Sequence, residues 1–235
     1  MPKLLTLLLL LLLIAPPKTE IPDSKRASDV RSKVWPKLQQ ELKTKGFATN
    51  GPAVYIRIIK DLSILELWAK QDNKYKLFKT YDVCTYSGGL GTKTHDGDGK
   101  SPEGFYTIEP KQLNPVSNYY LAINVGYPNK VEQLKGYTGN SIMVNGNCAS
   151  IGCYAMTDAR IEEIYTLVYQ AFAAGQQQIR VDIFPFRMDE TRLKLYNAYY
   201  PNQTAFWRTL KPGYSLFEKN HVPAEYHVKG KDYTF

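Results

Sequence analysis

The sequence has few residues of the types that bind metals or carry redox chemistry. Its 235 residues include three cysteines and three histidines. No pair of cysteines has CxxC spacing, so a redox role for Cys148 and Cys153 has little support, and we expect no metal site and no cofactor. The glycines from Gly88 to Gly99 lack GxxxxGK[ST] spacing, which excludes a phosphate-binding loop.

Long apolar runs are also scarce. Leu4–Ala15 is an uncharged, leucine-rich run preceded by Lys3. It is shorter than the roughly 20 residues that span a membrane, so residues 1–17 are predicted to be a secretory signal or, alternatively, a short anchor. Export would place the chain in the periplasm, an oxidising compartment where one disulfide leaves an odd cysteine.

Charge and composition limit the class of partner. The chain carries a net charge of +8, and 43% of its residues are hydrophobic, enough for one folded domain with appendages. The positive charge suits nucleic acid, acidic lipid or a carboxylate-rich wall, and export argues against nucleic acid. Residues 18–52 form a basic linker with a helical piece at 28–45. This segment contacts an anionic wall or the membrane periphery, or is simply solvated.

Hydrophobic alternation predicts a mostly β domain with packed helices (α+β) over residues 53–186. One or two helices are expected, the clearest at Asp158–Ala173 after Thr157 as N-cap. Residues 187–235 are an aromatic-rich C-terminal extension. The predicted strands are Val54–Lys60, Ile64–Lys70, Tyr75–Cys84, Tyr119–Val125, Ser141–Val144 and Gln178–Phe184.

The segment with catalytic character is Ile142–Met156. Its Ser150-Ile-Gly-Cys153 turn precedes a predicted helix, whose N-terminal field lowers a thiol pKa, and Gly152 lets backbone N–H groups converge on an oxyanion. Cys153 would then be a nucleophile that attacks a carbonyl. The alternative is a buried or disulfide-bonded cysteine, which suits Cys84 and Cys148 better; a bridge between them would leave Cys153 free.

Several motifs in order resemble the L,D-transpeptidase catalytic domain, the YkuD family, and its YafK-like branch in particular. The resemblance runs from about Ala53 to Tyr214. It rests on Tyr86-Ser-Gly-Gly-Leu-Gly91, Lys100-Ser-Pro-Glu-Gly-Phe-Tyr106, the Val144-to-Met156 segment, Phe184-Pro-Phe-Arg-Met188 and Leu210-Lys-Pro-Gly-Tyr214.

The resemblance implies a β-sandwich enzyme that acts on peptidoglycan stem peptides next to meso-diaminopimelate. A thioester forms on Cys153, with oxyanion N–H groups from Gly152 and Cys153, in a turn shaped by Ser150 and Gly146. Transfer to an amine gives a crosslink or attaches an outer-membrane lipoprotein. Transfer to water releases the lipoprotein, the reaction associated with the YafK-like branch.

Asn145 departs from the family pattern, because the family has its general-base histidine at this position. Three explanations compete: an inactivating change in an otherwise ordinary enzyme, a substitute base (His95, or less readily His221 or His227), and a peptidoglycan-binding pseudoenzyme. Loss of a general base typically costs about 10²- to 10⁴-fold in rate.

The groove lining is the last expectation from sequence. Tyr119, Tyr120 and Tyr137 are candidates for substrate contact, with packing in the core as the alternative for each.

Overall fold

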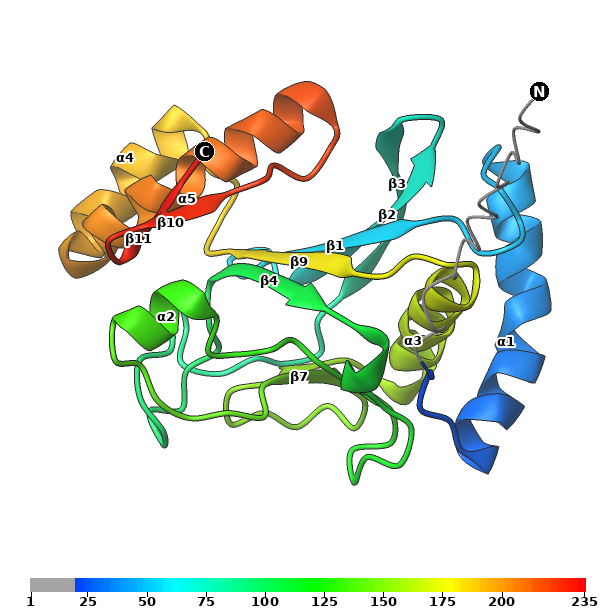
Figure 1. The fold of residues 1–235 in the computed structure, drawn as a ribbon. Coiled ribbons are helices and arrows are strands. Elements are labelled where there is room, and N and C mark those ends of the chain that lie inside the picture. The colour runs from blue at the N-terminus through cyan, green and yellow to red at the C-terminus, as the bar shows by residue number, and fades with distance from the viewer. Residues whose placement is uncertain (1–19) are drawn as a thin grey trace, which may run out of the picture.

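The computed structural model describes residues 20–235, so the predicted signal or anchor at 1–17 lies outside the described residues. The α+β class is confirmed (Figure 1). The described chain has five α-helices: two in the predicted domain at 53–186, where one or two were expected, one over the helical piece predicted at 28–45, and two in the C-terminal extension, where none was predicted. They are α1 (Lys25–Thr44), α2 (Lys130–Leu134), α3 (Asp158–Ala173), α4 (Glu190–Tyr199) and α5 (Thr204–Asn220).

A five-stranded sheet forms the centre of the fold. The three successive strands predicted from alternation form an antiparallel meander, which pairs with β9 in parallel through β1. The order is β3-β2-β1-β9-β4, and the strands are β1 (Val54–Ile59), β2 (Ile64–Gln71), β3 (Lys74–Asp82), β4 (Gly104–Ile108) and β9 (Ile179–Phe184). All six residues of β1 are buried, so both faces of this sheet are covered.

A smaller sheet in the order β5-β6-β7-β8 carries the candidate site. Its strands are β5 (Leu113–Asn114), β6 (Ala122–Asn124), β7 (Met143–Asn145) and β8 (Tyr154–Ala155). β6 and β7 are shorter than the predicted strands at 119–125 and 141–144. Tyr120 and Ser141 have φ of 70° and 57°, which ends the extended backbone there.

One apolar core joins the two sheets and two of the helices. Val54, Ile56 and Ile58 of β1 belong to it, together with Ile123 and Val144 of the smaller sheet. α3 contacts β1, β6 and β7, and therefore closes one end of the space between the sheets.

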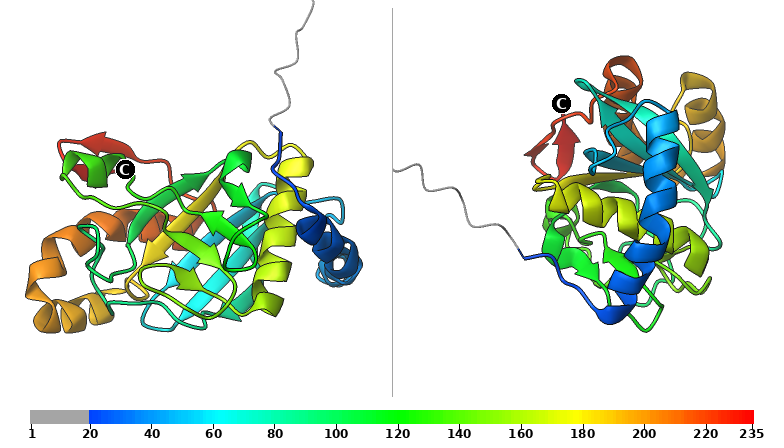
Figure 2. Two further views of the ribbon diagram at one scale, coloured as in Figure 1. Left: turned by 90° about the horizontal axis from the view of Figure 1, so that it is seen from below. Right: turned by 90° about the vertical axis from the view of Figure 1, so that its right-hand side faces the viewer.

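Helix α1 packs on α3 through residues at helical spacing, namely Ala27, Val30, Val34, Leu38 and Leu42. Figures 1 and 2 show this pair at the end of the molecule opposite α4 and α5. Lys33 and Lys37 lie 3.8 Å and 3.6 Å from the carboxylates of Glu162 and Glu163 on α3. These two lysines pair with α3, but their side chains remain 77% and 69% exposed, and contact of the segment with wall or membrane stays a prediction.

The C-terminal extension covers the other face of the large sheet. It contains α4, α5 and a hairpin of β10 (His227–Lys229) and β11 (Asp232–Thr234). Ile59 and Phe184 pack with Trp207 and Leu210 in a second core cluster, so the aromatic residues of this segment are mainly core. Across residues 20–235, no helix is long and apolar enough to cross a membrane.

Candidate active site

Strand register brings Cys153 and Asn145 together. β7 and β8 are parallel, with Val144 opposite Tyr154 and Asn145 opposite Ala155. Side chains match across a strand pair, so Asn145 and Ala155 share one face of the small sheet, and Cys153 directly precedes β8. Cys153 and Asn145 line the same cavity, which has a volume of about 720 Å³.

The three cysteines differ in their bonding. Cys84 and Cys148 form a disulfide, and Cys153 is free and partly exposed. Cys148 is therefore not a redox partner of Cys153. The bridge ties the residues after β3 to the turn that follows β7, and so anchors the turn that holds the free thiol.

The pKa of Cys153 is raised, whereas the sequence predicted that it would be lowered. Burial raises the pKa of this thiol, and a contact from the Met143 backbone N–H offsets only part of that rise. A lowering by the field of a following helix was predicted, but β8 intervenes and α3 begins only at Asp158. The thiol directly precedes β8, and five positions separate Cys153 from the first residue of α3.

Hydrogen bonds from serines hold the backbone around Cys153. Ser150 Oγ donates to the Cys153 carbonyl at 2.7 Å and accepts from the Gly152 N–H at 3.1 Å. Ser101 Oγ donates to the same carbonyl at 3.3 Å. Gly152 has φ of 143°, which favours glycine. Ser150 and Gly152 therefore shape the turn at residues 150–153, which we call the nucleophile turn after the role predicted for Cys153, and the Gly152 N–H is already engaged.

Asn145 is almost fully buried at the floor of the cavity. Its Nδ2 donates to the Gly146 carbonyl at 2.6 Å, and its Oδ1 is buried without a hydrogen-bond partner. Gly146 is tightly packed, because a Cβ there would lie 2.6 Å from the Asp158 carboxylate. An amide in this position donates and accepts hydrogen bonds but cannot take a proton near neutral pH.

The three tyrosines predicted to line the groove do not all lie in the cavity. Tyr119 lines the cavity, whereas Tyr120 and Tyr137 pack against the apolar core and are not part of the lining. Ile151 was not predicted to line the cavity, yet it does so and is 87% exposed, two positions before Cys153.

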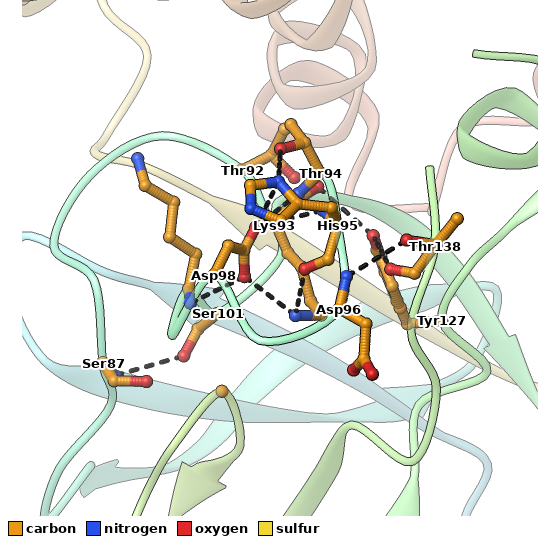
Figure 3. Close-up of polar contacts among 12 residues, drawn as sticks. Ser87, Thr92, Lys93, Thr94, His95, Asp96, Asp98, Ser101, Tyr127 and Thr138 are labelled. Atoms are coloured by element: carbon orange, nitrogen blue, oxygen red, sulfur yellow. Dashed lines mark hydrogen bonds and ion pairs between the residues drawn. The ribbon is translucent and has the colours of Figure 1, made fainter. Parts of the chain in front are cut away.

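One rim of the cavity is a preorganised loop centred on Asp98 (Figure 3). The Asp98 carboxylate accepts hydrogen bonds from Lys93 Nζ at 2.8 Å and from three backbone N–H groups, those of Thr94, His95 and Lys100. Although burial opposes ionisation, these donors hold the pKa of Asp98 well below its ordinary value. The sequence signal for this loop was its alternating Asp-Gly-Asp-Gly composition, which predicts turns without identifying their partners.

Neither His95 nor the other two histidines lines the cavity. The His95 side chain is 70% exposed, and its Nδ1 lies 3.1 Å from Thr94 Oγ1 on the same loop. His221 ends α5 beside Trp68 and Phe217, and His227 is exposed on β10. The structure therefore brings no histidine to the predicted base position, and the part of the chain it describes contains no metal-binding group of His, Cys, Asp or Glu.

A buried ion pair fixes the loop behind the cavity. Lys60 Nζ bonds the Glu103 carboxylate at 3.0 Å, and both side chains are fully buried. Lys60 also donates to the carbonyls of Gly91 and Ser101, at 3.0 and 2.9 Å. Glu103 accepts from the Gly91 N–H and from Trp207 Nε1, each at 2.7 Å. Residues 91–103 are thereby tied to β1 and to α5.

Comparison with known proteins agrees with this arrangement. Residues 54–183 match the YkuD family, described as the L,D-transpeptidase catalytic domain. The chain is 45% identical over 184 residues to YafK of Escherichia coli (strain K12), a candidate L,D-transpeptidase by name, with 78% of this chain and 74% of that protein covered. The same identity and coverage hold for YafK of Escherichia coli O157:H7.

Two solved structures have weaker similarity. The helical cell shape determining protein Pgp2 from Campylobacter jejuni is 18% identical, with a TM-score of 0.46 over 82% of this chain and 80% of that one. Bd1075 from Bdellovibrio bacteriovorus is 14% identical, with a TM-score of 0.36 over 69% of this chain and 59% of that one. The match of the family over more than half of the chain, and the identity to YafK, place this protein in the YkuD family of L,D-transpeptidase catalytic domains.

Proposed function

We propose that this chain is an exported peptidoglycan-modifying enzyme in which the Cys153 thiolate attacks a peptide bond next to meso-diaminopimelate. The observation that carries the proposal is the free Cys153 thiol, which shares one cavity with position 145. Family membership supports action on peptidoglycan. No cofactor enters this chemistry.

The reaction has two acyl transfers. The Cys153 sulfur forms a bond to the carbonyl carbon, the C–N bond breaks, and the leaving amine takes a proton. The resulting thioester then loses its acyl group to water or to an amine, and the thiol is restored. Transfer to water would release a peptidoglycan-linked lipoprotein, and we favour it over crosslinking because release is the reaction that the resemblance of the sequence motifs to the YafK-like branch implies.

The backbone of the nucleophile turn supplies the oxyanion donors in this proposal. The Cys153 N–H makes no hydrogen bond to another residue within 20–235 and is the first donor. The Gly152 N–H is the second, once the substrate oxygen replaces Ser150 Oγ as its acceptor. Ser150 keeps its bond to the Cys153 carbonyl throughout and so preserves the turn.

A peptidoglycan-binding protein without turnover is the second candidate. Asn145 stands at the base position, none of the residues lining the cavity is a histidine, and burial raises the pKa of the thiol. Each of these lowers the fraction of reactive thiolate at neutral pH. The cavity would then bind a stem peptide and leave it intact.

Mass spectrometry of muropeptides released from lipoprotein-bearing sacculi separates the two. We expect Asn145→His to raise product formation by about 10²- to 10⁴-fold over the unmodified chain, because it supplies a base to the thiol. Cys153→Ala in the same background is the matched control and should form no product. The product mass distinguishes a free carboxylate, from water, from a crosslink.

Each outcome favours either the enzyme or the binding protein. Turnover by the unmodified chain that is lost in Cys153→Ala would show that another group serves as base, and His95→Ala would then be measured. Stem-peptide binding with no turnover in any variant would overturn the enzyme proposal and favour the binding protein.

A further inference from the structure

A second hollow lies beside the glycine loop and shares no lining residue with the Cys153 cavity. It has a volume of about 360 Å³ and lies between residues 88–90 of that loop and the residues that join α4 to α5. The residues that line it are Gly88, Gly89, Leu90, Lys100, Tyr199, Tyr200, Pro201, Asn202 and Gln203. We call it the Lys100 groove.

The Lys100 groove adjoins the Cys153 cavity through two neighbouring residues. Gly99 lines the cavity and Lys100 lines the groove. The Lys100 carbonyl lies 3.3 Å from the point where a Cβ would stand on Gly152, in the nucleophile turn. A ligand held in the cavity therefore needs to extend only a short way to reach the groove.

Two polar side chains converge in the groove. Lys100 Nζ and Gln203 Nε2 each lie 3.3 Å from the point where a Cβ would stand on Gly91. Within residues 20–235, Lys100 has no carboxylate at ion-pair distance, whereas Lys60 and Lys93 nearby are paired with Glu103 and Asp98. An ammonium and an amide N–H with no protein acceptor form a site suited to a carboxylate.

The rim of the groove is aromatic. Tyr199 is 73% exposed and Tyr200 is 37% exposed, and both line the groove. Exposed tyrosine rings beside hydrogen-bonding groups present an apolar face with a polar edge, which is suited to the face of a sugar ring. A cation and exposed aromatic rings in one hollow fit a ligand that carries both a carboxylate and a sugar.

We infer that the Lys100 groove is a second subsite for the disaccharide-peptide of the wall, with a stem-peptide carboxylate on Lys100 and Gln203 and a sugar ring against Tyr199. The inference rests on the proposed function for its choice of ligand. It assigns Lys100, Gln203 and Tyr199 to binding, with no part in the bond-breaking step.

Binding to the full chain carrying Cys153→Ala tests the subsite without turnover. Isothermal titration with a disaccharide-tetrapeptide should show about a tenfold higher Kd for Lys100→Gln, since an ion-paired hydrogen bond is lost. Lys130→Gln, an exposed lysine on α2 outside the groove, is the matched control and should leave Kd unchanged. Tyr199→Ala should weaken binding of the disaccharide-tetrapeptide by about fivefold and leave binding of the free tetrapeptide unchanged.

Ligand-side controls identify the source of the carboxylate. Amidation of the peptide carboxylates should remove the difference between Lys100→Gln and the parent, because the two changes delete one interaction. Acetate that competes at concentrations like those of the disaccharide-tetrapeptide would overturn the inference, since the groove would then hold any small anion. An equal Kd for Lys100→Gln and the parent would also overturn it. If Asn145→His forms product but Lys100→Gln leaves Kd unchanged, the subsite is refuted and the enzyme proposal stands. If Lys100→Gln raises Kd but no variant forms product, the enzyme proposal is refuted and the subsite stands.

Discussion

The two sides of residues 91–103 differ in how completely their buried polar groups are paired. Behind the loop, Lys60, Glu103 and Trp207 satisfy one another and the backbone. In front of it, the Asn145 Oδ1 atom is buried without a partner. Buried polar groups in folded proteins are usually hydrogen-bonded, so the Asn145 Oδ1 atom is an exception on the cavity side. Four measurements test this difference between the two sides.

Removal of the carboxylate on the paired side should have the largest effect. Glu103→Gln leaves the buried Lys60 ammonium without its counter-charge, and breaking a buried pair from one side costs about 3–5 kcal/mol. Urea unfolding should show this loss, with the exposed Glu225→Gln as the matched control. A loss no larger than that of the control would mean that the ion pair does not hold the loop.

Removal of the disulfide on the cavity side should have the next largest effect. Cys84→Ser with Cys148→Ser should lower the free energy of unfolding by about 2–4 kcal/mol, because the bridge closes a loop of 64 residues in the unfolded chain. Cys153→Ser should leave stability nearly unchanged in the same denaturation experiment. Equal effects of the two changes would argue against the bridge as the anchor of the nucleophile turn.

Glu132 is an intermediate case between the two sides. It is buried and hydrogen-bonded, but no cation lies at ion-pair distance from it within residues 20–235. Tyr106 Oη donates to it at 2.5 Å and the Asn129 N–H at 2.7 Å. Burial nevertheless raises the pKa of Glu132 to about 7. The folded state therefore binds the proton more tightly than the unfolded state does, so this stabilisation is present below pH of about 4.5 and is lost as pH rises through about 7.

The measurement for Glu132 is stability against pH. The unfolding free energy should fall by roughly 1–3 kcal/mol between pH 4.5 and 7.5 through this group, and Glu132→Gln should flatten that part of the curve. Glu225→Gln should keep the slope. A slope retained in Glu132→Gln would assign it to other groups.

The smallest effect concerns the thiol itself. Burial raises the pKa of Cys153, so its alkylation rate should reach half of its maximum at a pH above the ordinary value of about 8.5. Asn145→His should move this midpoint downward, because a protonated imidazole stabilises the thiolate. The readout is the iodoacetamide rate from pH 6 to 11. An unchanged midpoint would mean that position 145 does not interact with the thiol.

Local patterns predicted the elements whose residues have strong periodicity. Asp158–Ala173 was predicted and found as α3, and the three strands after residue 53 were found as β1 to β3. The helices of the extension were not predicted, because residues 187–235 were identified only by their aromatic content. Many of these aromatic residues pack as core on the outer face of β1, a tertiary contact that no local pattern encodes.

Motif order predicted which residues of the nucleophile turn meet, and Ser150, Gly152 and Cys153 do lie together. The Lys60–Glu103–Trp207 cluster was not predictable, since its members are separated by 43 and 104 residues. The thiol pKa was also mispredicted. It depends on burial and on a two-residue strand, and neither leaves a signal in the sequence.

The bond between Trp207 and Glu103 also makes the cavity rim depend on the end of the chain. Trp207 follows Glu103 by 104 positions, so the residues that complete this loop lie far from it in sequence. Without α5, the outer face of β1 is uncovered and one oxygen of the buried carboxylate lacks its donor. A chain truncated before α5 would therefore hold its cavity rim only loosely.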